Sequence, residues 1–373
     1  MAQLFALVAA TSISRRTTRL SDGEYLRILL PVNKDTSTLI DLVEAAYNLD
    51  VDADRWLPHV MDAGLPLLDQ GLGVGALSFL RPLDGSKVVI HQHYAAAGPE
   101  DFAERNMRFT SEGSAEVSQA MTKPGMAVTL TEVAGEEYLE DVARWRKYFD
   151  YSQDAFGLTA VDPNGQGVFI IAPLSEVTSL RPSARLRWQM VGAHIAAGHR
   201  LRIAVERAVD RGESELPHQA EAMIDANSFR VSDAAGQGQS KSTANVIREA
   251  AVRIDRARGK LRKNDPEEAL AIWRGLSQGR WTLVDWFDTD GRRYALAVPN
   301  PPDLRDPRGL TERENQVVAY ATLGDSHKLI AYRLGLSRST VTKALRSAMR
   351  KLGVRTQAQL VAKMKPMPSS ETP

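Results

Sequence analysis

Three short segments near the C-terminal end of the chain share one pattern, which constrains the fold more than any other feature of the sequence. Each follows a hydroxyl residue and precedes a glycine: the hydroxyl residues are Thr311, Ser326 and Ser337, and the glycines are Gly324, Gly335 and Gly353. A hydroxyl oxygen can accept a hydrogen bond from a free backbone N–H in the first turn of a helix. A glycine just past the last turn adopts the left-handed conformation without strain. The pattern predicts three consecutive helices, and a fourth is expected from about Thr356.

The third of these helices, residues 338–352, has two chemically different faces. The apolar face carries Val341, Leu345, Ala348, Met349 and Leu352. The opposite face has no acidic residue and carries Arg338, Ser339, Thr342, Lys343, Arg346, Ser347 and Arg350. A short helix, a tight turn and a second helix form a helix-turn-helix, whose second helix enters the major groove of DNA. We therefore expect residues 308–365 to form an all-α, four-helix DNA-binding domain with residues 338–352 as its recognition helix.

The distribution of charge agrees with this interpretation. Residues 308–365 contain twelve Lys or Arg against three Asp or Glu, a net charge of +9. Residues 1–307 contain 35 Lys or Arg against 42 Asp or Glu, a net charge of −7. A basic domain attached to an acidic body indicates that the partner of the domain is double-stranded DNA.

Several spaced motifs in this domain resemble one known family. They are Leu310-Thr311-Glu312-Arg313-Glu314, Gly324-Asp325-Ser326-His327-Lys328-Leu329-Ile330-Ala331, Leu334-Gly335-Leu336-Ser337, Thr340-Val341 and Arg350-Lys351-Leu352-Gly353-Val354. In this order and without gaps, they strongly resemble the LuxR/GerE-type helix-turn-helix of transcriptional regulators. The resemblance covers about 55 residues, a small part of the chain.

The resemblance implies roles for individual residues. In that family the third helix enters the major groove, and the fourth pairs across a dimer. By position, the residues facing base edges are Thr342, Lys343 and Arg346, and those touching phosphates are Lys328, Arg338, Ser339, Thr340 and Arg350. Leu360, Val361 and Met364 are expected at the dimer contact, with packing in the core of the domain itself as the open alternative.

This sequence also departs from the usual family pattern. Thr342 stands where Lys is usual, Ala344 where His is usual and Gln316 where Glu is usual. Two of these departures lie on the recognition helix. The base preference of the family therefore cannot be transferred to this chain.

Residues 36–212 have the pattern of an α+β domain. Strands are predicted at Val74–Leu80, Lys87–Tyr94, Met126–Glu132, Ala155–Val161 and Gly167–Ala172, with helices before, between and after them. The turn sequences Asp84-Gly85 and Asp162-Pro163-Asn164-Gly165 indicate hairpins. Hairpins and interspersed helices favour an antiparallel sheet with helices packed on it. The order of elements resembles GAF/PAS-like sensor domains. A long helix from Ser183 to about Arg211 closes this domain and is our candidate for dimerisation.

Residues 213–300 allow two interpretations. Hairpins are predicted around Asp225–Ser228 and Asp288–Gly291, with helices at Thr243–Lys260 and Asp265–Leu276 between them. The segment is either a second small, PAS-like α+β unit or an extension of the first sheet. Residues 301–307 are proline-rich and predict a stiff, extended linker. Residues 1–35 are expected to form an N-terminal tail, and residues 366–373 are expected to form a disordered C-terminal tail.

Other features exclude functions. The chain has no cysteine, which excludes disulfides and thiolate zinc sites and fits a reducing cytoplasm. No stretch predicts a membrane span, and Arg15 and Arg16 follow the apolar N-terminal segment, the reverse of a signal peptide. Gly71, Gly73 and Gly75 lack the spacing of a dinucleotide loop. His91 and His93 have no evident third metal ligand. We expect no catalytic residue, no metal and no cofactor.

Aromatic residues are scarce in this chain, so their positions matter. Trp56, Trp145, Tyr148, Trp188, Trp273, Trp281 and Trp286 either line a ligand pocket or form plain core. Taken together, the sequence favours a dimeric, cytoplasmic, bacterial-type transcription regulator rather than an enzyme. Its body is expected to sense a small-molecule effector or a protein partner. The alternatives are an adaptor or anti-activator that uses the body as a partner surface, and an enzyme localised to DNA.

Overall fold

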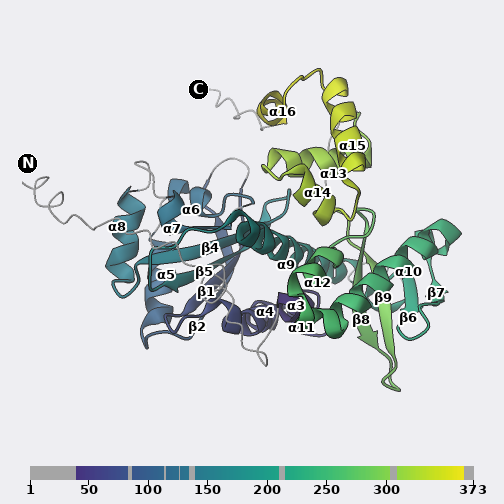
Figure 1. The fold of residues 1–373 in the computed structure, drawn as a ribbon, viewed down its shortest axis with the longest axis horizontal. Coiled ribbons are helices and arrows are strands. Elements are labelled where there is room, and N and C mark those ends of the chain that lie inside the picture. The colour runs from purple at the N-terminus through teal and green to yellow at the C-terminus, as the bar shows by residue number, and fades with distance from the viewer. Residues whose placement is uncertain are drawn as a thin grey trace, which may run out of the picture.

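The computed structural model describes residues 39–82, 86–112, 115–125, 127–133, 139–209, 215–302 and 309–364. The expected tails and most of the proline-rich linker lie outside these ranges. Figure 1 shows two sheets on either side of a long helix, α9, and a cluster of helices at the C-terminal end that lies against α9. The fold class predicted from the sequence is confirmed: an α+β body precedes an all-α domain.

The first sheet has five strands and is antiparallel throughout. Its strands are β1 (Val74–Leu80), β2 (Val89–Ala96), β3 (Ala127–Thr129), β4 (Asp154–Val161) and β5 (Gln166–Leu174), in the order β2-β1-β5-β4-β3. All five strands were expected near these positions, and β1 has the expected bounds. In β1, Ala76 and Leu77 are buried in different clusters because neighbouring residues of a strand face opposite sides of a sheet.

Helices cover both faces of this sheet. On one face lie α3 (Leu39–Ala46), α4 (Ala53–Leu68) and α9 (Pro182–Val209), and on the other lie α5 (Phe102–Ser111), α6 (Ala115–Met121) and α8 (Leu139–Tyr148). The second face is filled by aromatic rings. Trp145 stacks on Phe149 at 4.1 Å between ring centroids, and Phe109 meets Trp145 edge-on at 5.3 Å. Here the aromatic residues form core, as do the fully buried Trp56, Trp188 and Trp273.

Two elements of the first domain differ from the sequence expectation. The strand expected at Met126–Glu132 ends at Thr129, because the short helix α7 (Leu130–Val133) begins there. The Glu132 carboxylate, in this helix, accepts a hydrogen bond from the Thr129 N–H. Helix α4 was not expected, because Pro58 and Pro66 lie within it and interrupt the helical pattern.

The second sheet has four antiparallel strands. They are β6 (Ala222–Asp225), β7 (Val231–Ala234), β8 (Trp281–Phe287) and β9 (Arg293–Pro299), in the order β7-β6-β9-β8. Among the residues that the structure describes, these strands pair only with one another, so they do not extend the first sheet. The connecting elements are η2 (Pro217–Gln219), η3 (Gly236–Gln239), α10 (Lys241–Arg256), η4 (Ala257–Leu261), α11 (Arg262–Asn264) and α12 (Pro266–Ile272).

Both helices expected in this region are shorter than predicted. The first leaves α geometry at Ala257, where a π-helical turn includes Gly259 with ψ −145°. Ion pairs from Arg258 and Arg262 to Glu44 hold this turn against the first domain. The second helix ends at Ile272 because Trp273 turns into the core. There its ring centroid lies 6.4 Å from that of His194.

Helix α9 lies at the centre of the molecule. It contacts β4 and β5 of the first sheet, α3, α12 and the C-terminal helix α14. Residues 190–198 are buried without interruption. A Cβ at Gly198 would lie 2.2 Å from the carbonyl oxygen of Ala46, so only glycine permits this contact. The middle of α9 is thus covered by its own chain, whereas residues at both ends of the helix are exposed or half-buried, and the dimerisation expected of this helix stays a prediction.

Candidate DNA-binding site

The C-terminal domain consists of four helices, which begin within one residue of the predicted positions. They are α13 (Glu312–Thr322), α14 (His327–Arg333), α15 (Arg338–Lys351) and α16 (Gln357–Met364). Each of the three expected N-caps accepts its hydrogen bond: Thr311 from Glu314 N at 3.2 Å, Ser326 from Leu329 N at 3.3 Å and Ser337 from Thr340 N at 3.1 Å. The three glycines all have positive φ, between 61° and 90°.

Helix α15 is anchored by the apolar face predicted for it. Val341, Leu345, Ala348 and Leu352 are buried in the core of the domain, with Val317 and Ile330 of the neighbouring helices. Helices α14 and α15 contact each other across the turn at Gly335. The orientation of α15 is thus fixed by packing rather than by its exposed residues.

The opposite face of α15 is open to solvent. Lys343 and Arg346 are exposed, and Thr342 is half-buried, with its hydroxyl donating to the Arg338 carbonyl at 3.0 Å. The side chains expected at phosphates are Lys328, Arg338, Ser339 and Arg350, which are exposed, and Thr340, which is half-buried. In the described parts of the chain, no carboxylate pairs with Lys343, Arg346 or Arg338. These cations are therefore available to an external anion.

One basic residue of α15 is already occupied. Lys351 Nζ donates to Glu314 Oε2 at 2.6 Å, and the same carboxylate oxygen accepts from the Thr311 N–H at 2.7 Å. Burial opposes the charge of Glu314, but hydrogen bonds from Lys351 and Thr311 outweigh it and lower the pKa of Glu314 to about 2. Lys351 therefore holds the start of α13 against α15.

The residues expected at a dimer contact lie in two environments. Leu360 has no exposed surface and belongs to the core of the domain, which agrees with the packing alternative for this residue. Val361 and Met364 are half-buried, and Met364 packs against the same core. A dimer contact at Val361 and Met364 stays a prediction.

The side of the domain away from α15 is docked on the body. Tyr332 of α14 donates to the Leu270 carbonyl at 2.6 Å and lies 2.5 Å from Nε2 of His194, while Nδ1 of His194 lies 2.9 Å from the Tyr47 hydroxyl. All three contacts are satisfied if Nε2 carries the proton and Nδ1 accepts from Tyr47. Burial lowers the pKa of His194 to about 3, so the ring is neutral at physiological pH.

A second buried contact joins four segments of the chain. Arg200 of α9 bonds Asp162 in the β4–β5 turn at 2.5 Å, the Tyr320 hydroxyl of α13 at 3.3 Å and Asn300 after β9 at 2.9 Å. Tyr320 also donates to Asp162 at 3.2 Å. Burial opposes the charge of Arg200, but Asp162 keeps its pKa above the ordinary value. We use the name docking network for the residues of these two buried contacts. They are Arg200, Asp162, Asn300 and Tyr320, together with Tyr332, His194 and Tyr47.

Residues of the docking network were not predicted from the sequence. One signal was present: Gln316 departs from the family pattern, in which Glu is usual. Gln316 is 2% exposed and donates from Nε2 to the Gly279 carbonyl of the body at 2.9 Å. A carboxylate at this position has no hydrogen to donate, so the departure fits a contact with this particular body.

Two other patterns noted in the sequence have structural roles. The carboxylate of Asp69 accepts hydrogen bonds from the N–H groups of Gly71, Leu72 and Gly73, so its own chain fills the glycine-rich loop. Nε2 of His93 lies 2.8 Å from the side-chain oxygen of Asn106, whereas His91 is exposed. Within the described residues, no cluster of three or more potential metal ligands is present, and no helix is long and apolar enough to cross a bilayer.

Comparison with known proteins agrees with the geometry of the C-terminal domain. Residues 308–364 match the family described as bacterial regulatory proteins, luxR family. The predicted LuxR-type helix-turn-helix domain is thereby confirmed, and its presence supports a DNA-binding transcription regulator. The search of curated proteins found no match to the chain. The likeness of the body to GAF/PAS domains stays a prediction.

Proposed function

We propose that this protein is a sequence-specific, dimeric transcription regulator whose body controls its DNA-binding domain through the docking network. One observation carries the proposal: the domain is docked by α13 and α14, while the basic face of α15 is left open. A dimer reads two half-sites about one helical turn apart. Neutralisation of phosphates makes the binding strongly dependent on salt.

DNA selection with the full-length protein tests sequence specificity. The wild type is compared with Lys343→Ala plus Arg346→Ala at two salt concentrations. The matched control is Arg55→Ala plus Arg146→Ala, which removes two exposed cations from helices of the first domain. We expect a two-fold motif from the wild type and the control, and none from the α15 variant. A motif that is unchanged in the α15 variant would refute base reading by these residues.

We also propose that the body senses a small ligand, and a cavity supports this. It has a volume of about 380 Å³ and lies between the C-terminal part of α9 and the second sheet, with Val205 and Val298 among its apolar walls. Ligand sites commonly have volumes of about 300–1,000 Å³. Gln219 lines the cavity, and its side-chain oxygen is buried without a hydrogen-bond partner in the described chain. A mostly apolar ligand with one hydrogen-bond donor fits these walls.

The backbone beside this cavity is strained. His218 and Gln219 are consecutive and both have positive φ, 51° and 61°. Such conformations cost of order 1–3 kcal/mol each in residues other than glycine, and they cluster at ligand sites. Contacts lead from the cavity to the docking network: Glu221 pairs with Arg280 at 2.9 Å, and the Arg280 carbonyl accepts from the Asn300 N–H at 2.6 Å. Asn300 in turn holds Arg200.

Native mass spectrometry of the purified protein tests the sensing proposal. A bound ligand appears as extra mass, which should disappear in Val205→Trp, a variant that fills the cavity. A dimer without added mass, together with no change in thermal stability across a library of small apolar ligands, would favour an adaptor that acts by protein contact.

A further inference from the structure

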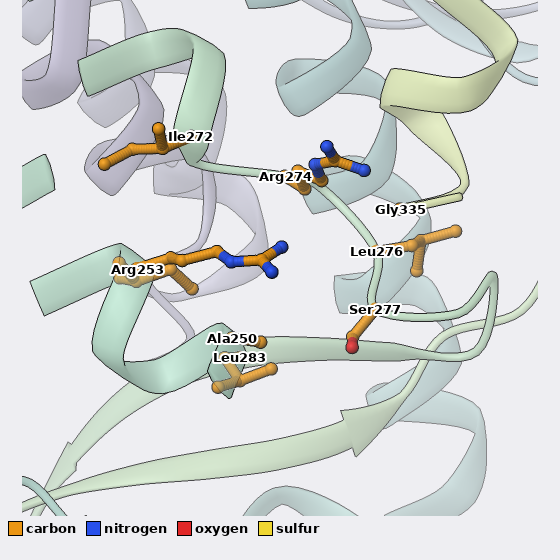
Figure 2. Close-up of a pocket in the computed structure, with 9 residues that line it drawn as sticks. Ala250, Arg253, Ile272, Arg274, Leu276, Ser277, Leu283 and Gly335 are labelled. Carbon is orange, nitrogen blue, oxygen red and sulfur yellow. The ribbon is translucent and has the colours of Figure 1, made fainter. Parts of the chain in front are cut away.

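A second hollow lies at the junction between the body and the DNA-binding domain, and we call it the junction hollow. It is lined by Arg253 of α10, Arg274 and Ser277 of the segment after α12, and Gly335 of the helix-turn-helix turn. Figure 2 shows Arg253 extending from α10 toward the segment that carries Arg274, with Ser277 and Gly335 near the other end of that segment. The two parts of the molecule touch tightly here: a Cβ at Gly335 would lie 1.9 Å from the Leu276 carbonyl oxygen.

The two arginines carry positive charge that the neighbouring carboxylates do not neutralise. Arg274 donates from Nη1 to the Leu336 carbonyl at 3.1 Å. Within the described chain, its buried Nε has no hydrogen-bond partner and no carboxylate pairs with it. Among the described residues, Arg253 pairs with Glu249 at 3.7 Å, an exposed pair within one helix. Such pairs contribute little. Burial, and after it the charge of Arg253, lower the pKa of Arg274.

The size of the junction hollow limits what can enter. Its volume is about 30 Å³, room for roughly two water molecules. A whole organic ligand does not fit, whereas a single tetrahedral anionic group at the open side can meet both guanidinium groups. Arginine binds phosphate with two parallel hydrogen bonds, and Ser277 adds a hydroxyl donor.

The position of the junction hollow bears on DNA. Leu336, whose carbonyl Arg274 holds, lies two residues before the start of α15 at Arg338. An anion between the arginines therefore lies beside the first turn of the recognition helix, and both cations come from the body rather than from the domain that matches the family.

We propose that Arg253 and Arg274, with Ser277, form a phosphate-binding site at the junction between the body and the DNA-binding domain. The phosphate group comes either from the DNA backbone beside the half-site or from a free phosphate compound. A phosphate from the DNA backbone presupposes the DNA binding proposed above, whereas a free phosphate compound does not. In either case the bound phosphate connects the body to the turn that precedes α15.

The test compares the wild type with Arg253→Ala plus Arg274→Ala, using the selected duplex over a series of salt concentrations and, separately, inorganic phosphate. If DNA supplies the phosphate, the double variant loses one phosphate contact, the slope of log K against log salt falls by about 0.9, and the selected motif is kept. If a free phosphate compound is the ligand, inorganic phosphate raises the Tm of the wild type but not of the variant, and the salt slope is unchanged.

Controls separate these outcomes from misfolding. Arg248→Ala plus Lys241→Ala removes two exposed cations of α10 outside the hollow and should behave as the wild type. Arg274 also holds the Leu336 carbonyl, so its loss can destabilise the junction. The second variant is therefore Arg253→Ala alone. It should show about half the change in salt slope or in phosphate response, with an unchanged Tm in the absence of phosphate. Equal salt slopes and equal phosphate responses in the wild type and both hollow variants would overturn the proposal. Phosphate binding without a selected DNA motif would instead refute only the proposed function.

Discussion

The DNA-binding domain has two faces that differ in almost every physical respect. The basic face of α15 is exposed, and its Arg338, Lys343 and Arg346 form no ion pair within the described chain. The face formed by α13 and α14 is buried, and its polar groups bond partners far away in sequence, such as His194, 138 residues from Tyr332. A change in the body can therefore alter how the domain is held without touching the exposed basic residues of α15. Substitutions on the two faces should separate stability from DNA affinity.

The largest effect is expected from Arg200→Ala on the docked side. The substitution leaves the buried carboxylate of Asp162 without its ion-pair partner, and breaking a buried pair in this way costs about 3–5 kcal/mol. Urea denaturation followed by tryptophan fluorescence measures the loss. Arg55→Ala, which removes an exposed cation, is the control. A loss below about 1 kcal/mol would show that the docking network does not hold the domain.

On the open face, Lys343→Ala and Arg346→Ala should each weaken specific DNA binding by about 1–3 kcal/mol if the side chain reads a base. Binding to a matched duplex and to a scrambled duplex at fixed salt checks this. The urea midpoint should stay at the wild-type value, because neither side chain is buried. A shift of the midpoint in these variants would break the separation between the two faces.

Gln316→Glu tests the docked face with the residue that is usual in the family. The new carboxylate faces the Gly279 carbonyl and can no longer donate to it, so a loss of roughly 1–3 kcal/mol is expected from the unsatisfied acceptor. Gln316→Met is of similar size and removes both the amide donor and the amide oxygen. It also loses the hydrogen bond but adds no repulsion between a carboxylate and the Gly279 carbonyl oxygen, so it should destabilise the protein less than Gln316→Glu.

Tyr332→Phe removes one hydroxyl from the docking network. The Leu270 carbonyl and His194 Nε2 then lose their partner, with an expected cost of about 1–2 kcal/mol. Hydrogen exchange of α14 should rise in this variant while that of α15 changes less. Equal increases in the two helices would mean that the docked face and the open face are not independent.

The smallest effect concerns pH. The pKa of Glu314 is about 2 in the folded domain, below its ordinary value of 4.5. The ion pair with Lys351 is therefore fully stabilising above about pH 4.5, and its contribution is lost as the pH falls toward 2. Thermal unfolding from pH 6 to pH 3 should show a decline that is weaker in Glu314→Gln. An identical decline in both proteins would contradict the assignment.

The two faces also differ in how far the sequence predicts them. The caps at Thr311, Ser326 and Ser337 and the exposed cations of α15 follow from patterns within a few residues, and the structure has the caps where expected. In the body, the bounds of β1 were predicted in the same way. Such signals are local, so one segment is enough to detect them.

The docked face depends on pairs that no local pattern contains. Tyr320 meets Asp162 across 158 residues, and Trp273 leaves its helix because the core beside His194 accepts it. The sequence expectation likewise missed α4, whose prolines obscure its apolar face. The cover over the middle of α9 was equally invisible to local patterns, since it comes from the first sheet, from α3 and α12, and from α14 of the C-terminal domain.

The apolar core has a consequence for how the body unfolds. One continuous cluster of buried side chains runs from Val74 in the first sheet to Trp281 in the second and includes Tyr332 of the C-terminal domain. Elements that share a core melt together. Calorimetry should therefore record a single endotherm for both sheets, and an effector bound near the second sheet should raise the melting temperature of the first sheet by the same amount.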